Sequence, residues 1–343
     1  MKNLYKLFAD CIPVKGYQRS IIYDIRRCEF KFIPNKLYDI LCQNPLLDFD
    51  SIKKAHNFSE KEVIDSYFDF LMTNEFIFQC TKKTVKCFND IEIKYKTPYL
   101  INNVIVEIDK TSKFNLQELF KNLENLGCID LQIKIFDVIA MNKINDILSY
   151  TCNKRIRSIE LIIPYMKSFI NKENIFSLLQ NNLRITSLII YATEKEEIDT
   201  LNVQFKNKFS KIYFCSDEID SSLHCGFVSP MYFTINLPFF MESKLFNNCL
   251  NQKLAIDKEG NIKNCTALNK SYGNIDNDNL SHIISSSEFQ KLWKIRKDEV
   301  LVCQDCEFRY MCSDCRTFTK NDDLYGKPKY CHYDPYKMKW TNL

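Results

Sequence analysis

Four cysteines within 13 residues constrain this chain more than any other feature. They follow the spacing C-x2-C-x5-C-x2-C, as Cys303, Cys306, Cys312 and Cys315. Two thiols separated by two residues can approach one metal through a tight turn, so each half of the motif is a chelating pair. The motif therefore predicts a metal site, and thiolate ligands suit both zinc and an iron–sulfur cluster.

Three more cysteines flank the motif: Cys249 and Cys265 before it, and Cys331 after it. These seven lie within 83 residues, whereas the first 248 residues hold nine scattered singly. A disulfide framework is the alternative interpretation. However, the sequence shows no secretory signal, and a chain of 343 residues can bury a core without such cross-links. We therefore expect metal ligation in a reducing cytoplasm.

Composition argues against several other functions. The net charge is +4, from 47 basic and 43 acidic residues, and no basic run appears, so we expect no nucleic-acid partner. The longest apolar stretches, such as Ile159–Pro164, have the length of strands, so we expect no membrane-spanning helix. With only six glycines, the chain contains neither a G-x-G-x-x-G nor a P-loop motif.

The first 90 residues predict a winged-helix-like module of short strands and three short helices. The third helix is expected to begin at Ser59 as N-cap, with Glu62 completing a capping box. This helix is acidic, which favours a peptide- or protein-binding module over a DNA-binding one, and a structural cap is the alternative. The expected elements are a hairpin over Tyr17–Cys28 and Glu29–Ile33, helices over Asn35–Cys42, Asp48–His56 and Ser59–Asn74, and a closing hairpin of Phe76–Cys80 and Thr84–Phe88.

Residues 91–240 alternate between apolar strands and helical segments with a period of 25–30 residues. Such a pattern is typical of a parallel sheet, and we expect a partial (β/α) barrel rather than a leucine-rich-repeat solenoid. No catalytic constellation is evident, so catalytic residues remain unknown. The expected strands are Asn103–Ile108, Asp130–Phe136, Ser158–Ile163, Ile185–Tyr191 and Lys211–Cys215. The expected helices are Asn115–Leu126, Asn142–Tyr150, Lys172–Asn181 and Glu194–Gln204.

Residues 241–343 carry a recognisable cysteine pattern. The spacing Cys249-x10-Gly260-x4-Cys265, followed by the C-x2-C-x5-C-x2-C motif and Cys331, resembles the SPASM domain of radical-SAM peptide-modifying enzymes. The last short gap is two residues here, against three in the usual pattern. Gly260 is expected in the turn of a hairpin, Lys253–Asp257 with Asn261–Asn264, that brings Cys249 and Cys265 together.

The SPASM resemblance implies one or two [4Fe–4S] clusters. The ligands implied for the first are Cys303, Cys306, Cys312 and Cys331. Those implied for the second are Cys249, Cys265 and Cys315. Family members often add a fourth ligand six residues before the first cysteine, where this chain has Ser243. Either Cys225 or His224 substitutes for it, or the site stays open, or the second cluster is absent.

One departure from the radical-SAM pattern is decisive for chemistry. The C-x3-C-x2-C motif that holds the catalytic cluster is missing, and the loop after the first barrel strand, Asp109–Phe114, contains no cysteine. Without three thiolates to hold that cluster, the chain has no site at which S-adenosylmethionine (SAM) could be bound and cleaved, so no SAM is expected. The chain is accordingly interpreted as an accessory or degenerate radical-SAM-like protein.

The chain as a whole is similar to the SPASM-domain peptide maturases of grasp-with-spasm systems. The stretches that carry this resemblance are Cys11–Gly16, Arg19–Asp24, Gly260–Cys265 and Cys306–Tyr310. It implies two partners, a ribosomally made precursor peptide and an ATP-grasp ligase. The N-terminal module is similar to a leader-recognition domain that accepts a peptide as an added strand. The residues expected to bind the peptide are Ser20, Ile21, Ile22, Tyr23 and Asp24.

Three functions remain open at this point. The first, which the absence of a catalytic motif favours, is a maturation factor that binds the precursor for the ligase and carries auxiliary clusters. The second is a redox enzyme that modifies the peptide through an open auxiliary cluster without SAM cleavage. The third is a zinc-stabilised interaction module.

Overall fold

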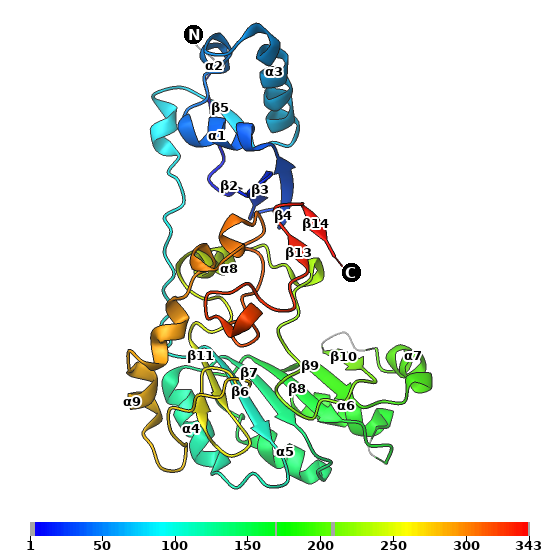
Figure 1. Ribbon diagram of the computed structural model, residues 1–343. Coiled ribbons are helices and arrows are strands. Elements are labelled where there is room, and N and C mark those ends of the chain that lie inside the picture. The colour runs from blue at the N-terminus through cyan, green and yellow to red at the C-terminus, as the bar shows by residue number, and fades with distance from the viewer. Residues whose placement is uncertain (1–3, 169, 207–209, 342–343) are drawn as a thin grey trace. The chain divides into compact units, whose positions relative to one another are not determined.

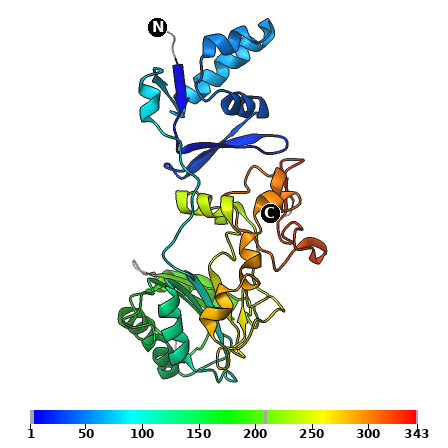
Figure 2. The ribbon, with the colours of Figure 1, turned by 90° about the vertical axis from the view of Figure 1, so that its left-hand side faces the viewer.

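The computed structural model describes residues 4–168, 170–206 and 210–341 and has a mixed α/β architecture (Figure 1). The chain folds into two compact units, each assembled from segments that are distant in sequence. Unit 1 comprises Met1–Tyr95, Gly226–Asn248 and Ile295–Leu343. Unit 2 comprises Lys96–Cys225 and Cys249–Lys294. Figure 2 shows the same elements from a second direction.

Unit 2 is built on a seven-stranded sheet in which every neighbouring pair except the last is parallel. Apolar side chains on alternate strand positions, such as Val104, Val106 and Ile133, are fully buried in one core. The strands in spatial order are β10 (Lys211–Phe214), β9 (Ile185–Tyr191), β8 (Ser158–Pro164), β7 (Asp130–Ile135), β6 (Asn103–Ile108), β11 (Lys253–Ile256) and β12 (Ile262–Lys263).

Helices connect the parallel strands, as the apolar periodicity predicts. In α4, Leu119 and Leu123 are buried, and the Asn115 side chain caps the N-terminus by accepting a hydrogen bond from the Glu118 N–H at 3.1 Å. The predicted strand–helix alternation is confirmed. Strands β6 to β10 lie side by side in the order of the chain, as consecutive (β/α) units do. The partial barrel itself stays a prediction. The helices of unit 2 are α4 (Leu116–Leu126), α5 (Met141–Ser149), α6 (Lys172–Asn181), α7 (Lys195–Gln204) and α9 (Leu280–Ser285).

The predicted hairpin around Gly260 is also confirmed, and it extends the sheet because β11 pairs in parallel with β6. Gly260 has φ +82°, and an added Cβ would meet the Ile275 side chain at 3.2 Å, so this turn requires glycine. Asp257 closes the turn by accepting hydrogen bonds from the N–H groups of Glu259 at 3.1 Å and Asn261 at 2.9 Å.

Unit 1 begins with two small antiparallel sheets and a group of helices. One sheet pairs β1 (Leu4–Leu7) with β5 (Ile77–Cys80). The other has the order β2–β3–β4, with strands β2 (Cys11–Val14), β3 (Ser20–Asp24) and β4 (Glu29–Ile33). The helices are α1 (Asn35–Gln43), α2 (Phe49–Lys54) and α3 (Phe58–Thr73). Strands β3, β4 and β5 and the three helices lie near their predicted bounds, whereas β1 and β2 were not predicted. The winged-helix assignment remains a prediction.

Two details of the N-terminal prediction are wrong. The N-cap of α3 is Asn57 rather than Ser59, because the Glu60 carboxylate accepts a hydrogen bond from the Asn57 N–H at 3.3 Å. The segment Thr84–Cys87 is a 3-10 turn rather than a strand, and β5 pairs with β1 instead. Thr81 and Thr84 explain the turn, since the hydroxyl group of each accepts a hydrogen bond from the backbone N–H of the other.

The rest of unit 1 contains little regular structure. Helix α8 (Leu237–Leu245) and the short strands β13 (Tyr333–Asp334) and β14 (Lys339–Trp340) accompany long loops. Tyr23 of β3 shares a core with Phe240 and Phe308, so the N-terminal sheet and the cysteine-rich loop are packed together within unit 1. None of the helices in the described ranges has the length and apolar content needed to cross a membrane.

We expect the Asp257→Ala variant to lose about 1–3 kcal/mol of unfolding free energy at pH 7, because it leaves turn donors without an acceptor. Burial alone would raise the pKa of Asp257, but Lys263, at 2.9 Å, and the Asn261 N–H outweigh it and lower the pKa. The contribution is therefore present above the ordinary pKa, about 4, and is lost as pH falls through the lower folded-state pKa. Urea unfolding at pH 7 and pH 3 measures the difference.

The control for this experiment is Asp199→Ala, which removes an exposed carboxylate from α7. We expect this change to alter the unfolding free energy by less than about 0.5 kcal/mol at either pH. An Asp257→Ala loss that is the same at both pH values would show that the carboxylate charge does not stabilise the turn.

Candidate metal centre

The C-x2-C-x5-C-x2-C motif lies in an irregular loop of unit 1. Cys303 and Cys312 are buried, whereas Cys306 and Cys331 are half-buried. Val302, directly before the first cysteine, has φ +68°, a left-handed conformation that a β-branched residue rarely adopts. Strained backbone of this kind costs about 1–3 kcal/mol and persists where the surrounding structure imposes it, often at functional sites.

The four thiols implied for the first cluster lie close enough to affect one another's ionisation. Burial raises the pKa of Cys303 to about 12, and Cys312 and Cys331 contribute to the rise. Burial also raises the pKa of Cys306, with a further contribution from Cys303. The structure describes all 16 cysteines and joins none of them in a disulfide. Burial thus favours the protonated form of Cys303 and Cys306, and a bound metal would replace their protons.

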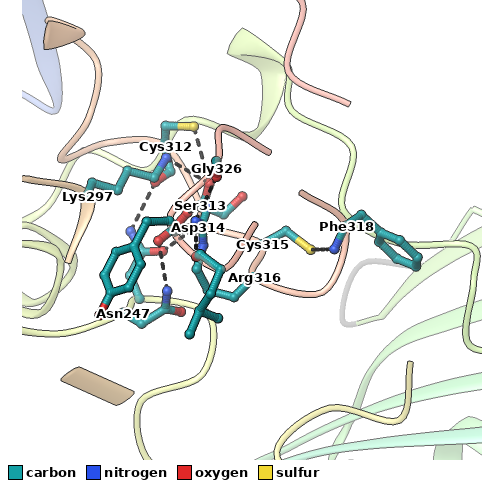
Figure 3. Close-up of polar contacts among 12 residues, drawn as sticks. Asn247, Lys297, Cys312, Ser313, Asp314, Cys315, Arg316, Phe318 and Gly326 are labelled. Atoms are coloured by element: carbon teal, nitrogen blue, oxygen red, sulfur yellow. Dashed lines mark hydrogen bonds and ion pairs between the residues drawn. The ribbon is translucent and has the colours of Figure 1, made fainter. Parts of the chain in front are cut away.

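Lys297 lies beside Cys312, one of these four thiols (Figure 3). Its side chain is 3% exposed, and its Nζ donates a hydrogen bond to the Ser313 carbonyl oxygen at 2.9 Å. Burial alone would lower the pKa of the Lys297 ammonium. Cys312, Cys303 and Asp314 outweigh that effect and raise its pKa. A buried cation therefore faces the predicted ligands.

A buried ion pair fixes the segment that follows the third cysteine of the motif. The Arg316 guanidinium donates to an Asp314 carboxylate oxygen at 2.6 Å, and both side chains are essentially inaccessible to solvent. Asp314 also accepts from the Asn247 amide at 2.8 Å, as Figure 3 shows. Arg316 donates further to the carbonyl oxygens of Leu324 at 3.0 Å and Gly326 at 2.9 Å. These side chains thus add to the backbone hydrogen bonds that the loop makes itself, such as the one from the Cys306 N–H to the Cys303 carbonyl oxygen at 3.0 Å.

Cys315 has surroundings suited to a thiolate. Its Sγ accepts a hydrogen bond from the Phe318 N–H at 3.4 Å. Gly226, with φ +86°, approaches so closely that an added Cβ would stand 3.1 Å from the same sulfur. Hydrogen bonds from backbone N–H groups to sulfur tune iron–sulfur clusters.

The other predicted ligands belong to different parts of the chain. Cys249 and Cys265 are half-buried residues of unit 2, whereas Cys315 belongs to unit 1. The set implied for the second cluster is therefore divided between the two units, and it stays a prediction.

The candidates for a fourth ligand are exposed or already hydrogen-bonded. Cys225 and His224 are exposed, and the His224 imidazole lies 3.2 Å from the Asp220 carboxylate. Ser243 is buried, and its hydroxyl accepts a hydrogen bond from the Asn248 amide at 2.7 Å. The structure accordingly singles out none of the three as a ligand.

The predicted peptide-binding residues form strand β3, at the centre of its sheet. All five side chains are buried, and both backbone edges of the strand are paired, with β2 and β4. The residues are Ser20, Ile21, Ile22, Tyr23 and Asp24. An incoming strand would have to pair with β2 or β4 instead.

Within the described ranges, no three His, Cys, Asp or Glu side chains are placed to hold a single metal ion. The donor set nevertheless fits a thiolate-bound cluster in its chemistry: buried soft ligands, no competing disulfide, and a buried ammonium beside Cys303 and Cys312. Sequence reasoning missed Lys297 and the Asp314–Arg316 pair. Only the position of Asp314 inside the motif indicated its proximity to the ligands.

We expect Asp314→Ala to lower the free energy of unfolding by about 3–5 kcal/mol, because it leaves the Arg316 charge buried without a partner. Adding Arg316→Met should recover part of the loss. Anaerobic denaturant unfolding measures both variants. The matched control is Asp39→Ala, which breaks a half-exposed ion pair with Lys15 and should cost less than about 1 kcal/mol. Equal losses in the two single variants would contradict the structural role of Asp314.

Comparison with known families agrees with the chemistry of this loop. A SPASM domain, an iron–sulfur cluster-binding domain, is found at residues 248–307. The match includes Cys249, Cys265, Cys303 and Cys306. A search of curated proteins finds no match to the chain. The protein thus contains a SPASM domain within a mixed α/β chain.

Proposed function

We propose that this protein is a maturation factor for a ribosomally synthesised peptide, which binds the precursor and acts with an ATP-grasp ligase. The observation that carries the proposal is the SPASM domain at residues 248–307, a domain typical of radical-SAM peptide maturases. The resemblance of Cys11–Gly16 and Arg19–Asp24 to grasp-with-spasm maturases supports the choice of partners. In this proposal residues 1–90 receive the leader, 91–240 form the partial barrel and 241–343 bind the clusters.

The residues proposed to hold the first cluster belong to one loop system of unit 1. They are Cys303, Cys306, Cys312 and Cys331. A bound iron–sulfur cluster would supply electron transfer or an iron that coordinates substrate. The protein's own contribution is to exclude water from the thiols, to fix the loop through Asp314 and Arg316, and to place Lys297 beside the sulfurs.

The register of the N-terminal sheet indicates where a leader strand would pair. The Ile25 N–H donates to the Asp10 carbonyl, so the Pro13–Ile22 pair on the same ladder is a non-hydrogen-bonded one. The backbone groups of Ile22 therefore face β4 and Lys31. Hydrogen-bonded and non-hydrogen-bonded positions alternate along β4. The backbone N–H and C=O groups of every second residue of β4 therefore point away from β3.

Those outward groups belong to Phe30 and Phe32. Strand β2 offers a poorer edge, because Pro13 has no N–H to donate. Across the described residues, no backbone hydrogen bond reaches β4 other than its pairing with β3. We therefore propose β4 as the strand to which the leader adds.

The cluster proposal predicts that Cys306→Ala lowers bound iron and sulfide and reduces the visible charge-transfer absorbance of anaerobically prepared protein. The reason is that each cubane iron needs a thiolate from the chain. Chemical analysis of iron, sulfide and zinc after cluster reconstitution measures the effect. Cys152→Ala, which removes an exposed cysteine of unit 2, is the control and should keep the wild-type content.

Two results would contradict the cluster proposal. Stoichiometric zinc without iron in the reconstituted wild type would favour the zinc-stabilised interaction module. Wild-type iron and sulfide in Cys306→Ala would remove Cys306 from the ligand set.

The strand-addition proposal predicts that Phe32→Pro weakens binding of the cognate leader peptide at least tenfold relative to Phe32→Ala. Tenfold corresponds to about 1.4 kcal/mol. Both variants lose the ring that packs on Phe308 and under Arg19, and only proline also loses the outward N–H. Calorimetric titration of the full chain measures the difference, with iron content and circular dichroism as checks on folding. Equal affinities in the two variants would place the leader elsewhere.

A further inference from the structure

The Lys297 ammonium is buried without a carboxylate of its own. It forms no ion pair with an acidic side chain in the described ranges, and its nitrogen donates to the Ser313 carbonyl oxygen, 2.9 Å away. Asp314 lies nearby, but its carboxylate is bound to Arg316 at 2.6 Å and to Asn247 at 2.8 Å. Asp314 therefore offsets the charge of Lys297 only in part, because its carboxylate is shared with Arg316.

The groups that remain to offset this charge are the thiols. Protonated thiols are neutral and stabilise a buried cation only weakly, whereas thiolates on a metal cluster leave the filled site with a net negative charge. Glu307, next to Cys306, is a further acid at this site, but it already pairs with Arg19 at 2.8 Å. Lys297 thus lies where cysteines acting as ligands would bring negative charge.

We infer that Lys297 is a positioning residue that raises the reduction potential of the cluster held by Cys303, Cys306, Cys312 and Cys331, by placing a buried positive charge beside two of its sulfurs. The inference rests on the proposed function, because it requires that cluster. Lys297 itself binds no metal and undergoes no covalent change.

The direction of the effect follows from electrostatics. When an external reductant such as dithionite supplies one electron, no bond forms or breaks and no proton needs to move, and the site becomes one charge more negative. A nearby cation stabilises that product more than the oxidised state. Because Lys297 is only 3% exposed, water and salt screen its charge far less than they screen a surface lysine.

The test compares three variants of the full chain after anaerobic reconstitution. Lys297→Met removes the charge with similar side-chain length, Lys297→Arg keeps it, and Lys320→Met removes an exposed charge from the same unit. At the applied potential that half-reduces the wild type, Lys297→Met should show at least a tenfold lower ratio of reduced to oxidised cluster. That corresponds to a midpoint about 59 mV lower for one electron. Electron paramagnetic resonance (EPR) during a redox titration measures the ratio.

The possible outcomes distinguish failure of the inference about Lys297 from failure of the proposed function. A lowered midpoint in Lys297→Met, with wild-type midpoints in Lys297→Arg and Lys320→Met, supports the inference. An unchanged midpoint in Lys297→Met overturns it and leaves the cluster intact. A wild type without iron overturns both the inference and the proposed function.

A second measurement needs no variant and decides the matter if Lys297→Met does not fold. Wild-type protein labelled with 15N at the lysine side chains is reduced and studied by pulse EPR. A 15N hyperfine coupling to the cluster is expected from Lys297, whose buried nitrogen contacts the ligand loop. A reduced cluster that shows no lysine 15N coupling would overturn the inference.

Discussion

Charge buried in the cysteine-rich loop is the constraint on which unit 1 depends. This loop has little helix or strand, and Arg316 and Lys297 donate hydrogen bonds to its carbonyl groups in addition to the backbone hydrogen bonds of the loop itself. Burying two cations is costly unless each is offset, and only Arg316 has its own carboxylate, Asp314. The remaining cation links the stability of the loop to the ionisation of the cysteines around it.

Packing connects this loop to the N-terminal sheet within unit 1. Phe308, inside the motif, contacts both Phe30 and Phe32 of β4, with ring centroids 5.6 and 5.9 Å apart. Arg19 lies over the Phe32 ring and pairs with Glu307. One side of the proposed leader-binding strand therefore rests on the metal-binding loop. A leader that pairs with β4 would be held beside the residues that carry the cysteines.

The sequence predicted unit 2 well because its pattern is regular. Near-continuous apolar runs in Asn103–Ile108 and Ile185–Tyr191 defined both strands to the residue. Local side-chain hydrogen bonds were harder to predict. Asn57, not Ser59, is the N-cap of α3, and the hydrogen bonds between Thr81 and Thr84 form a turn where a strand was expected. At the site, spacing identified the cysteines, but a lysine in a charged stretch gives no sign that the fold buries it.

The loop after β6 is closed by its own polar side chains. The segment Asp109–Phe114 contains no cysteine, and the Asp109 side chain closes the loop on itself. Its carboxylate accepts hydrogen bonds from the Thr111 N–H at 2.7 Å and the Ser112 N–H at 3.0 Å, and Lys258 pairs with it at 3.4 Å. The polar groups of the loop are thereby used to stabilise the fold. The four thiols proposed as cluster ligands lie instead in unit 1, so the chemistry proposed for this chain belongs to its cysteine-rich region.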